Sequence, residues 1–86
     1  MTKKQIIKIG VTIQFRKEIL DTEGRALLKL LQNKDSSIKE CHYGKYIVLH
    51  LEESDSQKAL EVARKMSQNI LSNELIEKFE LKIIED

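Results

Sequence analysis

Residues 7–15 read IKIGVTIQF, and every second side chain in this segment is apolar. The apolar members are Ile7, Ile9, Val11, Ile13 and Phe15, separated by Lys8, Gly10, Thr12 and Gln14. A period of two, combined with β-branched side chains, predicts a β-strand with one buried face. We therefore expect the odd-numbered side chains of this segment to form the centre of a core.

The residues that follow predict a helix and then two short strands. Asp21 can accept a backbone N–H at the start of a helix, and the leucines of residues 27–31 give that helix an apolar stripe. After a polar loop, residues 38–43 and 45–51 predict two strands around a tight turn that includes Gly44.

The C-terminal part of the chain predicts a second helix and a last strand. Ser54 and Gln57 have the spacing of a capping box, so this helix should begin there and run to about residue 71 or 72. Asn73 is expected to terminate it, since asparagine tolerates the left-handed conformation. Alternating apolar side chains in residues 79–83 predict the last strand.

These elements occur in the order β-α-β-β-α-β, which is typical of an α+β two-layer sandwich. We expect a four-stranded antiparallel sheet with both helices on one face, a ferredoxin-like layout. A chain of 86 residues is short for two cores, so the sequence predicts a single domain spanning 1–86.

The second face of this sheet should remain uncovered, because two helices cover one side. Its expected members are Ile6, Gly10, Thr12, Tyr46, Val48, His50 and Ile84. A face that mixes apolar and aromatic side chains is typical of an interface, so we predict self-association through Tyr46, Val48 and His50. The alternative is a partly exposed sheet, since scattered surface apolar residues are ordinary.

Composition disfavours several classes of function. Fifteen basic and fourteen acidic side chains give a formal net charge of +1, which disfavours nucleic-acid binding. The sequence has no apolar run near the roughly 20 residues that cross a bilayer, so we expect no membrane association. A single cysteine fits a reducing, cytoplasmic location.

The sequence contains no pattern typical of a catalytic or metal site. Cys41 and His42 are adjacent, so on a strand their side chains point to opposite faces and cannot act as a nucleophile and its base. Two histidines are too few for a structural zinc site, and no glycine-rich phosphate loop is present. We therefore expect no catalytic, metal-binding or cofactor-binding residue. The carboxylates of Glu77, Glu80, Glu85 and Asp86 are expected to be a solvated C-terminal segment.

Three short motifs resemble those of a known family. They are formed by Leu20, Asp21 and Gly24, by Gly44 and Lys45, and by Leu71, Asn73, Ile76 and Glu77. In order and spacing the chain resembles the PurS family, the small subunits of phosphoribosylformylglycinamidine synthase, from about residue 8 to residue 81. It departs from the family pattern where Thr22 replaces a proline, Cys41-His42 replaces Val-Arg, and Ser72 and Glu74 replace alanine and proline.

The resemblance implies an accessory subunit that is itself non-catalytic. In such a complex the PurQ glutaminase releases ammonia, and the PurL synthetase uses ATP and magnesium to convert formylglycinamide ribonucleotide to the amidine in purine biosynthesis. The small subunit would bridge these partners, assist ammonia transfer, bind no cofactor itself, and form a homodimer or a dimer of dimers.

The same resemblance, together with the glycine positions, suggests which residues meet the partner subunits. We predict contacts through Asp21, Gly24, Gly44, Lys45 and Asn73. A bulky replacement of Gly44 should leave the domain folded but abolish stimulation of the synthase. The alternative function is a small-molecule-sensing regulatory module with the same layout and without glutamine-dependent partners.

Overall fold

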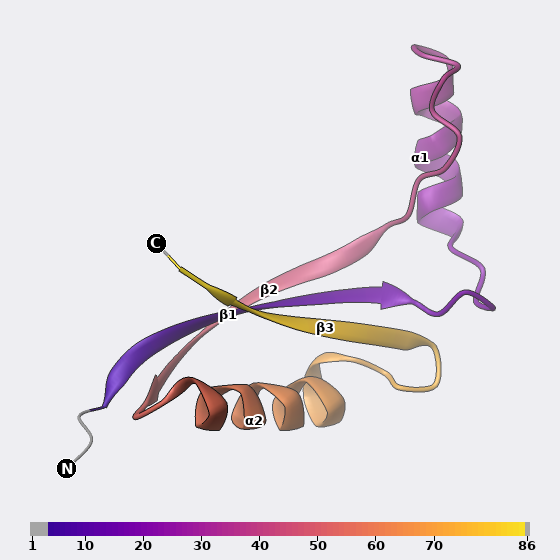
Figure 1. Ribbon diagram of the computed structural model, residues 1–86. Helices are drawn as coiled ribbons and strands as arrows, with labels where there is room; N and C mark the ends of the chain where they lie inside the picture. Colours follow the sequence, from indigo (N-terminus) through magenta and orange to yellow (C-terminus); the bar gives the residue numbers. More distant parts are fainter. Residues whose placement is uncertain (1–3, 86) are drawn as a thin grey trace.

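The computed structural model describes residues 4–85, so residues 1–3 and Asp86 of the predicted domain lie outside the described part. Three strands and two helices follow one another along the chain (Figure 1). Their bounds are β1 Gln5–Phe15, α1 Thr22–Gln32, β2 Gly44–Glu53, α2 Ser56–Met66 and β3 Glu77–Ile84, with a π-helical turn, Ser67–Leu71, directly after α2.

The first strand is the centre of the sheet. The strand order is β2-β1-β3 and both pairings are antiparallel, with Val11 opposite Ile47 on one side and Leu81 on the other. Ile7, Ile9, Val11 and Ile13 are buried, as the alternation predicts. Flanking strands complete the layer with half-buried side chains at Ile47, Leu49, Leu51, Phe79, Leu81 and Ile83.

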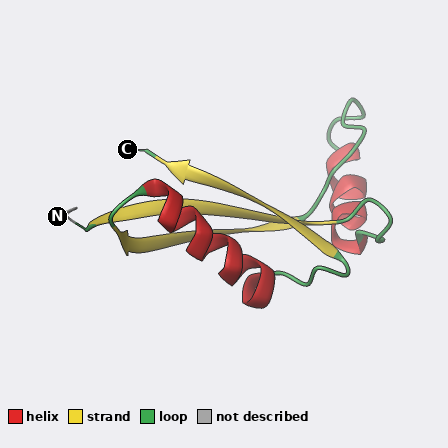
Figure 2. Ribbon diagram, turned by 60° about the horizontal axis from the view of Figure 1, so that its bottom comes forward, coloured by secondary structure: helices red, strands yellow, loops and turns green. Residues whose placement is uncertain are grey.

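Helix α2 covers one face of this sheet (Figure 2). Ala59 and Ala63 are fully buried against it, and their small side chains let the helix approach the strands closely. Its cap is Asp55, whose Oδ1 accepts the Lys58 N–H at 2.9 Å, so the predicted capping box at Ser54 is wrong by one residue. The Asp55 carboxylate has the role predicted for Ser54, because it accepts the N–H of the residue three positions later.

The helical segment ends where the sequence predicts, at residue 71, but by a different mechanism. The Ser67 carbonyl oxygen accepts both the N–H and the hydroxyl of Ser72, at 2.9 and 2.8 Å, which closes a π-helical turn. Because no residue in 4–85 has a positive φ, Asn73 does not take the predicted left-handed conformation, and neither does Gly44. Gly44 is instead the first residue of β2, not part of a tight turn.

Helix α1 does not lie on the sheet, which contradicts the prediction that both helices share one face. It projects from the end of the sheet, and the chain returns along it to β2 (Figures 1 and 2). We call residues 21–43, which comprise α1 and this return segment, the arm. Its apolar stripe is therefore left open, and Leu27, Leu30 and Leu31 are all exposed.

Residues 38–43 form no strand, so the sheet has three strands and the predicted four-stranded, ferredoxin-like layout is wrong. Side chains of the arm form hydrogen bonds with two backbone groups of this segment. Gln32 Nε2 donates to the Ile38 carbonyl oxygen at 2.8 Å, and the Tyr43 N–H donates to Asp21 Oδ2 at 2.8 Å. Hydrogen bonding of this kind offers the backbone an alternative to a ladder.

The arm makes the molecule long for its size. Its principal extents are 58 × 30 × 13 Å and its radius of gyration is 16.7 Å. A compact domain of this length has a radius of gyration of about 12 Å. The chain by itself therefore leaves much surface, the arm above all, without an intramolecular neighbour.

Candidate partner interface

The predicted interface residues gather where β1 ends and β2 begins. Asp21 lies at the base of the arm, Gly44 and Lys45 open β2, and Asn73 belongs to the loop that leads into β3. These positions are far apart in the sequence, and the contacts described below join them at one end of the sheet. We call this region the junction.

Asp21 ties the two ends of the arm together. Its Oδ1 accepts the Gly24 N–H at 2.9 Å, which caps α1, and its Oδ2 accepts the Tyr43 N–H at 2.8 Å, just before β2. These backbone hydrogen bonds, from Tyr43 first and Gly24 second, lower the pKa of the Asp21 carboxyl group, and the nearby His42 acts in the same direction. One ionised side chain thus holds the arm closed at its base.

Gly24 is buried inside this closure. A Cβ atom at this position would collide with the Asp21 carboxylate and would lie 2.6 Å from the Cys41 carbonyl oxygen. The close approach that the glycine permits is therefore made by the chain's own return segment. Contact with another molecule through Gly24 stays a prediction.

Gly44 is equally confined, by β1. A Cβ atom there would lie 2.5 Å from the Ile13 carbonyl oxygen, a backbone atom that cannot move without shifting the strand. A bulky replacement would therefore push β1 and β2 apart at this end. Because the replacement would disturb the sheet as well as any partner contact, the expectation that the domain stays folded while stimulation is lost stays a prediction, and a cleaner test of partner contact needs other positions.

Lys45 and Asn73 are connected through Glu77. Lys45 Nζ lies 3.6 Å from Glu77 Oε2, while Glu77 Oε1 accepts the Asn73 N–H at 2.8 Å. The Glu77 side chain is only 11% exposed, against 60% for Lys45. The prediction that Glu77 belongs to a solvated C-terminal segment is therefore wrong. Its side chain connects β2 to the loop before β3.

Arg16 cross-links the same loop to the end of β1. Its backbone N–H donates to the Ile76 carbonyl oxygen at 2.8 Å, and its Nε donates to the Glu74 carbonyl oxygen at 2.8 Å. Sequence reasoning did not single out Arg16, because one arginine after a strand carries no signal of a long-range partner. Glu77 carried a signal of a structural role, because it belongs to the third motif, but its carboxylate was expected to be solvated.

Two cavities flank the junction. One, of about 290 Å³, has the cationic side chains of Arg16, Lys17 and Lys78 in its lining. The other, of about 320 Å³, lies on the Lys45 side and includes Gly44, Ile76 and Glu77. Both share Gln14, Phe15 and Tyr43. The surface of the junction is thus hollowed on two sides of one framework.

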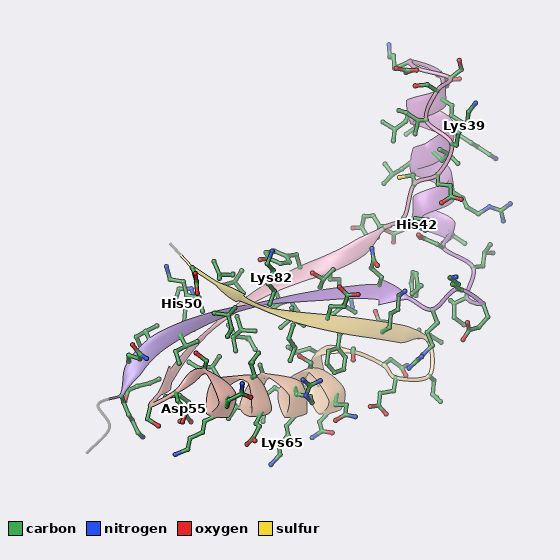
Figure 3. The ribbon with its side chains drawn as sticks, viewed as in Figure 1. Lys39, His42, His50, Asp55, Lys65 and Lys82 are labelled. Atoms are coloured by element: carbon green, nitrogen blue, oxygen red, sulfur yellow. The ribbon has the colours of Figure 1, made fainter. Side chains whose placement is uncertain are left out.

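The predicted self-association residues follow Lys45 along β2, on the face of the sheet opposite α2. Tyr46 is 64% exposed and Val48 42%, and His50, which is labelled in Figure 3, is also exposed. The Tyr46 ring lies over Gly10, where a Cβ atom would collide with the tyrosine hydroxyl. The absence of a Cβ atom at Gly10 therefore allows this ring to pack against β1, and the contact of this face with a second chain stays a prediction.

Groups that could perform chemistry are sparse at both surfaces. Within residues 4–85, no three His, Cys, Asp or Glu side chains are grouped so that they could hold a metal ion. His42 lies 3.4 Å from Glu40 and both are exposed, while Cys41 is half-buried in the arm. None of the helices described is long and apolar enough to cross a membrane. The features of the junction that another molecule could recognise are its two cavities and their charged side chains.

Comparison with known proteins gives a consistent result. Residues 8–85 match the family described as PurS, phosphoribosylformylglycinamidine (FGAM) synthase. A curated relative, the phosphoribosylformylglycinamidine synthase subunit PurS of Thermotoga maritima, is 27% identical over 78 residues, covering 90% of this chain and 95% of the relative.

Two solved structures have the same fold. The crystal structure of the purS subunit from Thermotoga maritima superimposes with a TM-score of 0.89 at 24% identity, covering 94% of each chain. A chain in the structure of PurLQS from the same organism gives a TM-score of 0.87 at 25% identity, covering 93% of this chain and 99% of that one. The three-stranded sheet and the projecting arm therefore belong to a fold already seen in solved structures.

Proposed function

Because the chain belongs to the PurS family, whose members are subunits of phosphoribosylformylglycinamidine synthase, we propose that it joins the glutaminase and synthetase subunits of that enzyme and assists ammonia transfer. The chain is a PurS subunit of this synthase. The PurLQS structure, which holds a chain of the same fold, supports PurL and PurQ as its partners.

The observation that carries the proposal is the junction itself. Three motifs converge there: Asp21, Arg16 and Glu77 form hydrogen bonds with backbone groups that fix loops in place, and Lys45 forms an ion pair with Glu77. Catalysis requires a nucleophile or a general acid–base group within reach of a substrate. Loops that are held in place by such hydrogen bonds suit a subunit that recognises other proteins.

Bridging has a chemical reason in this reaction. Ammonia released into neutral water is mostly protonated and no longer nucleophilic, whereas a sealed contact between subunits keeps it neutral and concentrated. Excluding water from a reactive intermediate is a general function of closed active sites. We propose that ATP and magnesium are bound by the synthetase, that this chain binds no cofactor, and that the complex is cytoplasmic.

We further propose that the chain acts as a homodimer or a dimer of dimers, with Tyr46, Val48 and His50 in a contact. The arm supports the same proposal, because Leu30 is 64% exposed and Leu27 and Leu31 are also uncovered. A row of exposed leucines on one helix is unusual for a monomer and typical of an interface. A second copy of the chain would also cover the projecting arm, which gives this short chain its radius of gyration of 16.7 Å.

The test is reconstitution of the synthase with and without this chain. We expect omission to abolish amidine formation from glutamine while leaving activity with added ammonium salt, since free ammonia bypasses the glutaminase. Full glutamine-dependent activity without the chain would contradict the proposal, as would turnover by the chain alone. Stimulation that instead requires a metabolite bound by this chain would favour the regulatory alternative.

A further inference from the structure

Positive charge exceeds negative charge in the lining of the first of the two cavities at the junction. Its lining includes Arg16, Lys17 and Lys78, from the end of β1 and the start of β3. In residues 4–85, none of these three side chains forms an ion pair. Like charges that share one concavity repel each other, and a bound anion relieves that repulsion.

The one carboxylate in the lining, Asp21, offsets only one of these three positive charges. Asp21 directs one oxygen at the Gly24 N–H and the other at the Tyr43 N–H, so both of its oxygens already accept hydrogen bonds. His42 also lines this cavity. Its Nε2 lies 3.4 Å from Oε2 of Glu40, a residue of the arm that is not in the lining. Figure 3 shows His42 where the arm meets β2.

The remaining wall is apolar and decides the kind of anion. Phe15, Ile19 and Tyr43 contribute to it. An inorganic ion has no surface to bury against these side chains, whereas a carboxylate on an aliphatic stem would contact both wall and cations.

We propose that this cavity receives an acidic side chain, Asp or Glu, presented by a loop of the synthetase or the glutaminase. The inference rests on the proposed function and adds to it the chemistry of one contact. Arg16 is held in position by its bonds to the loop at residues 74–76, so its remaining N–H groups are preorganised for a carboxylate. Lys17 and Lys78 form the exposed rim that steers the partner.

The experiment replaces the rim lysines and leaves Arg16 intact, because Arg16 also supports the fold. The variant is Lys17→Glu/Lys78→Glu, and its matched control is Lys58→Glu/Lys65→Glu on α2. All four side chains are exposed, and both variants have the same net charge, so any difference between them is local. Affinity for each isolated subunit is measured at about 50 and 200 mM salt, which spans a large change in screening length.

We expect the rim variant to bind one of the two subunits about tenfold or more weakly, with a shallower salt dependence than the wild type. The control should stay within about twofold of the wild type, as is usual for exposed charges outside an interface. The milder pair Lys17→Gln/Lys78→Gln should fall between them, and circular dichroism checks that each variant is folded. A zero-length carbodiimide cross-link should join Lys17 or Lys78 to an Asp or Glu of the same subunit.

Unchanged binding by the folded rim variant would overturn the inference, as would an equal loss in the control. Tight binding of inorganic phosphate to the isolated chain, lost in the rim variant while subunit binding persists, would identify a small-anion site instead and also overturn it. If the wild-type chain binds neither subunit, the proposed function itself fails and this inference with it.

Discussion

Glu77 offers the sharpest test of how the junction is held together. Replacement by alanine removes the acceptor of the Asn73 N–H and the partner of Lys45. A hydrogen bond to a charged group contributes about 1.5–3 kcal/mol, and the lower end applies because Asn73 is exposed and water can replace the carboxylate. The ion pair adds less than about 1 kcal/mol, since Lys45 is 60% exposed.

The total of about 2 kcal/mol corresponds to a fall in melting temperature of about 8–16 °C for a domain of this size. Glu77→Gln keeps an oxygen for the Asn73 N–H and loses the ion pair, so its melting temperature should fall by about 4–8 °C at most. Both are measured by circular dichroism at one protein concentration, because association also shifts the melting temperature. High salt should reduce the gap between the wild type and Glu77→Gln.

The control is Glu80→Ala, on the same strand but exposed, which should stay within about 0.5 kcal/mol of the wild type. Equal melting temperatures for the alanine and glutamine variants would refute the reasoning, because the loop would then not depend on the retained acceptor. A loss in Glu80→Ala as large as in Glu77→Ala would refute it too, since the effect would belong to the strand and not to the cross-link.

Three further predictions concern other parts of the chain. Gly10→Ala should displace the Tyr46 ring and destabilise the protein, whereas Gly10→Ala combined with Tyr46→Ala should recover part of the loss in a denaturant titration; full additivity of the two changes would contradict the contact. The pKa of Asp21 is lowered on folding, so the stability it contributes is present above about pH 3.8 and is lost as the pH falls through the folded-state value. Acid unfolding should therefore be less steep in Asp21→Asn, and an unchanged acid limb would count against the two backbone hydrogen bonds. Leu27→Glu/Leu30→Glu, on the exposed stripe of the arm, should lower the mass measured by sedimentation without changing the far-ultraviolet spectrum, and an unaltered mass would remove the arm from the self-association proposal.

Local patterns predicted the parts of the fold that depend on short-range rules. Alternation in residues 7–15 placed the central strand and its buried face, and the Asp21 cap was confirmed by the hydrogen bond to Gly24. Both features depend on side-chain period and on orphan N–H groups within a few residues. The α2 cap missed by one residue, because Ser54 and Asp55 offer equivalent oxygens to the same turn.

The arm could not be predicted in the same way. The leucines of residues 27–31 have the period of a helix that covers a sheet. Periodicity does not say whether that sheet belongs to the same chain or to another one. Residues 38–43 likewise look like a strand, yet Asp21 and Gln32 satisfy backbone groups of that segment. Such pairings join residues whose spacing in the sequence carries no signal, and the same is true of Arg16 with Glu74 and of Lys45 with Glu77.

The strand order β2-β1-β3 has a consequence for how the chain folds. The middle strand, β1, is synthesised first, and β3 is synthesised last. Their pairing joins Phe15 to Glu77 and Lys8 to Ile84, across most of the chain. Pairing across so long a loop is slow, and until it forms the edge of β1 that faces β3 has unpaired backbone groups. Nascent chains should therefore be captured by chaperones until β3 has emerged, and shortening β3 by a few residues should impair folding more than an equal deletion at the tip of the arm.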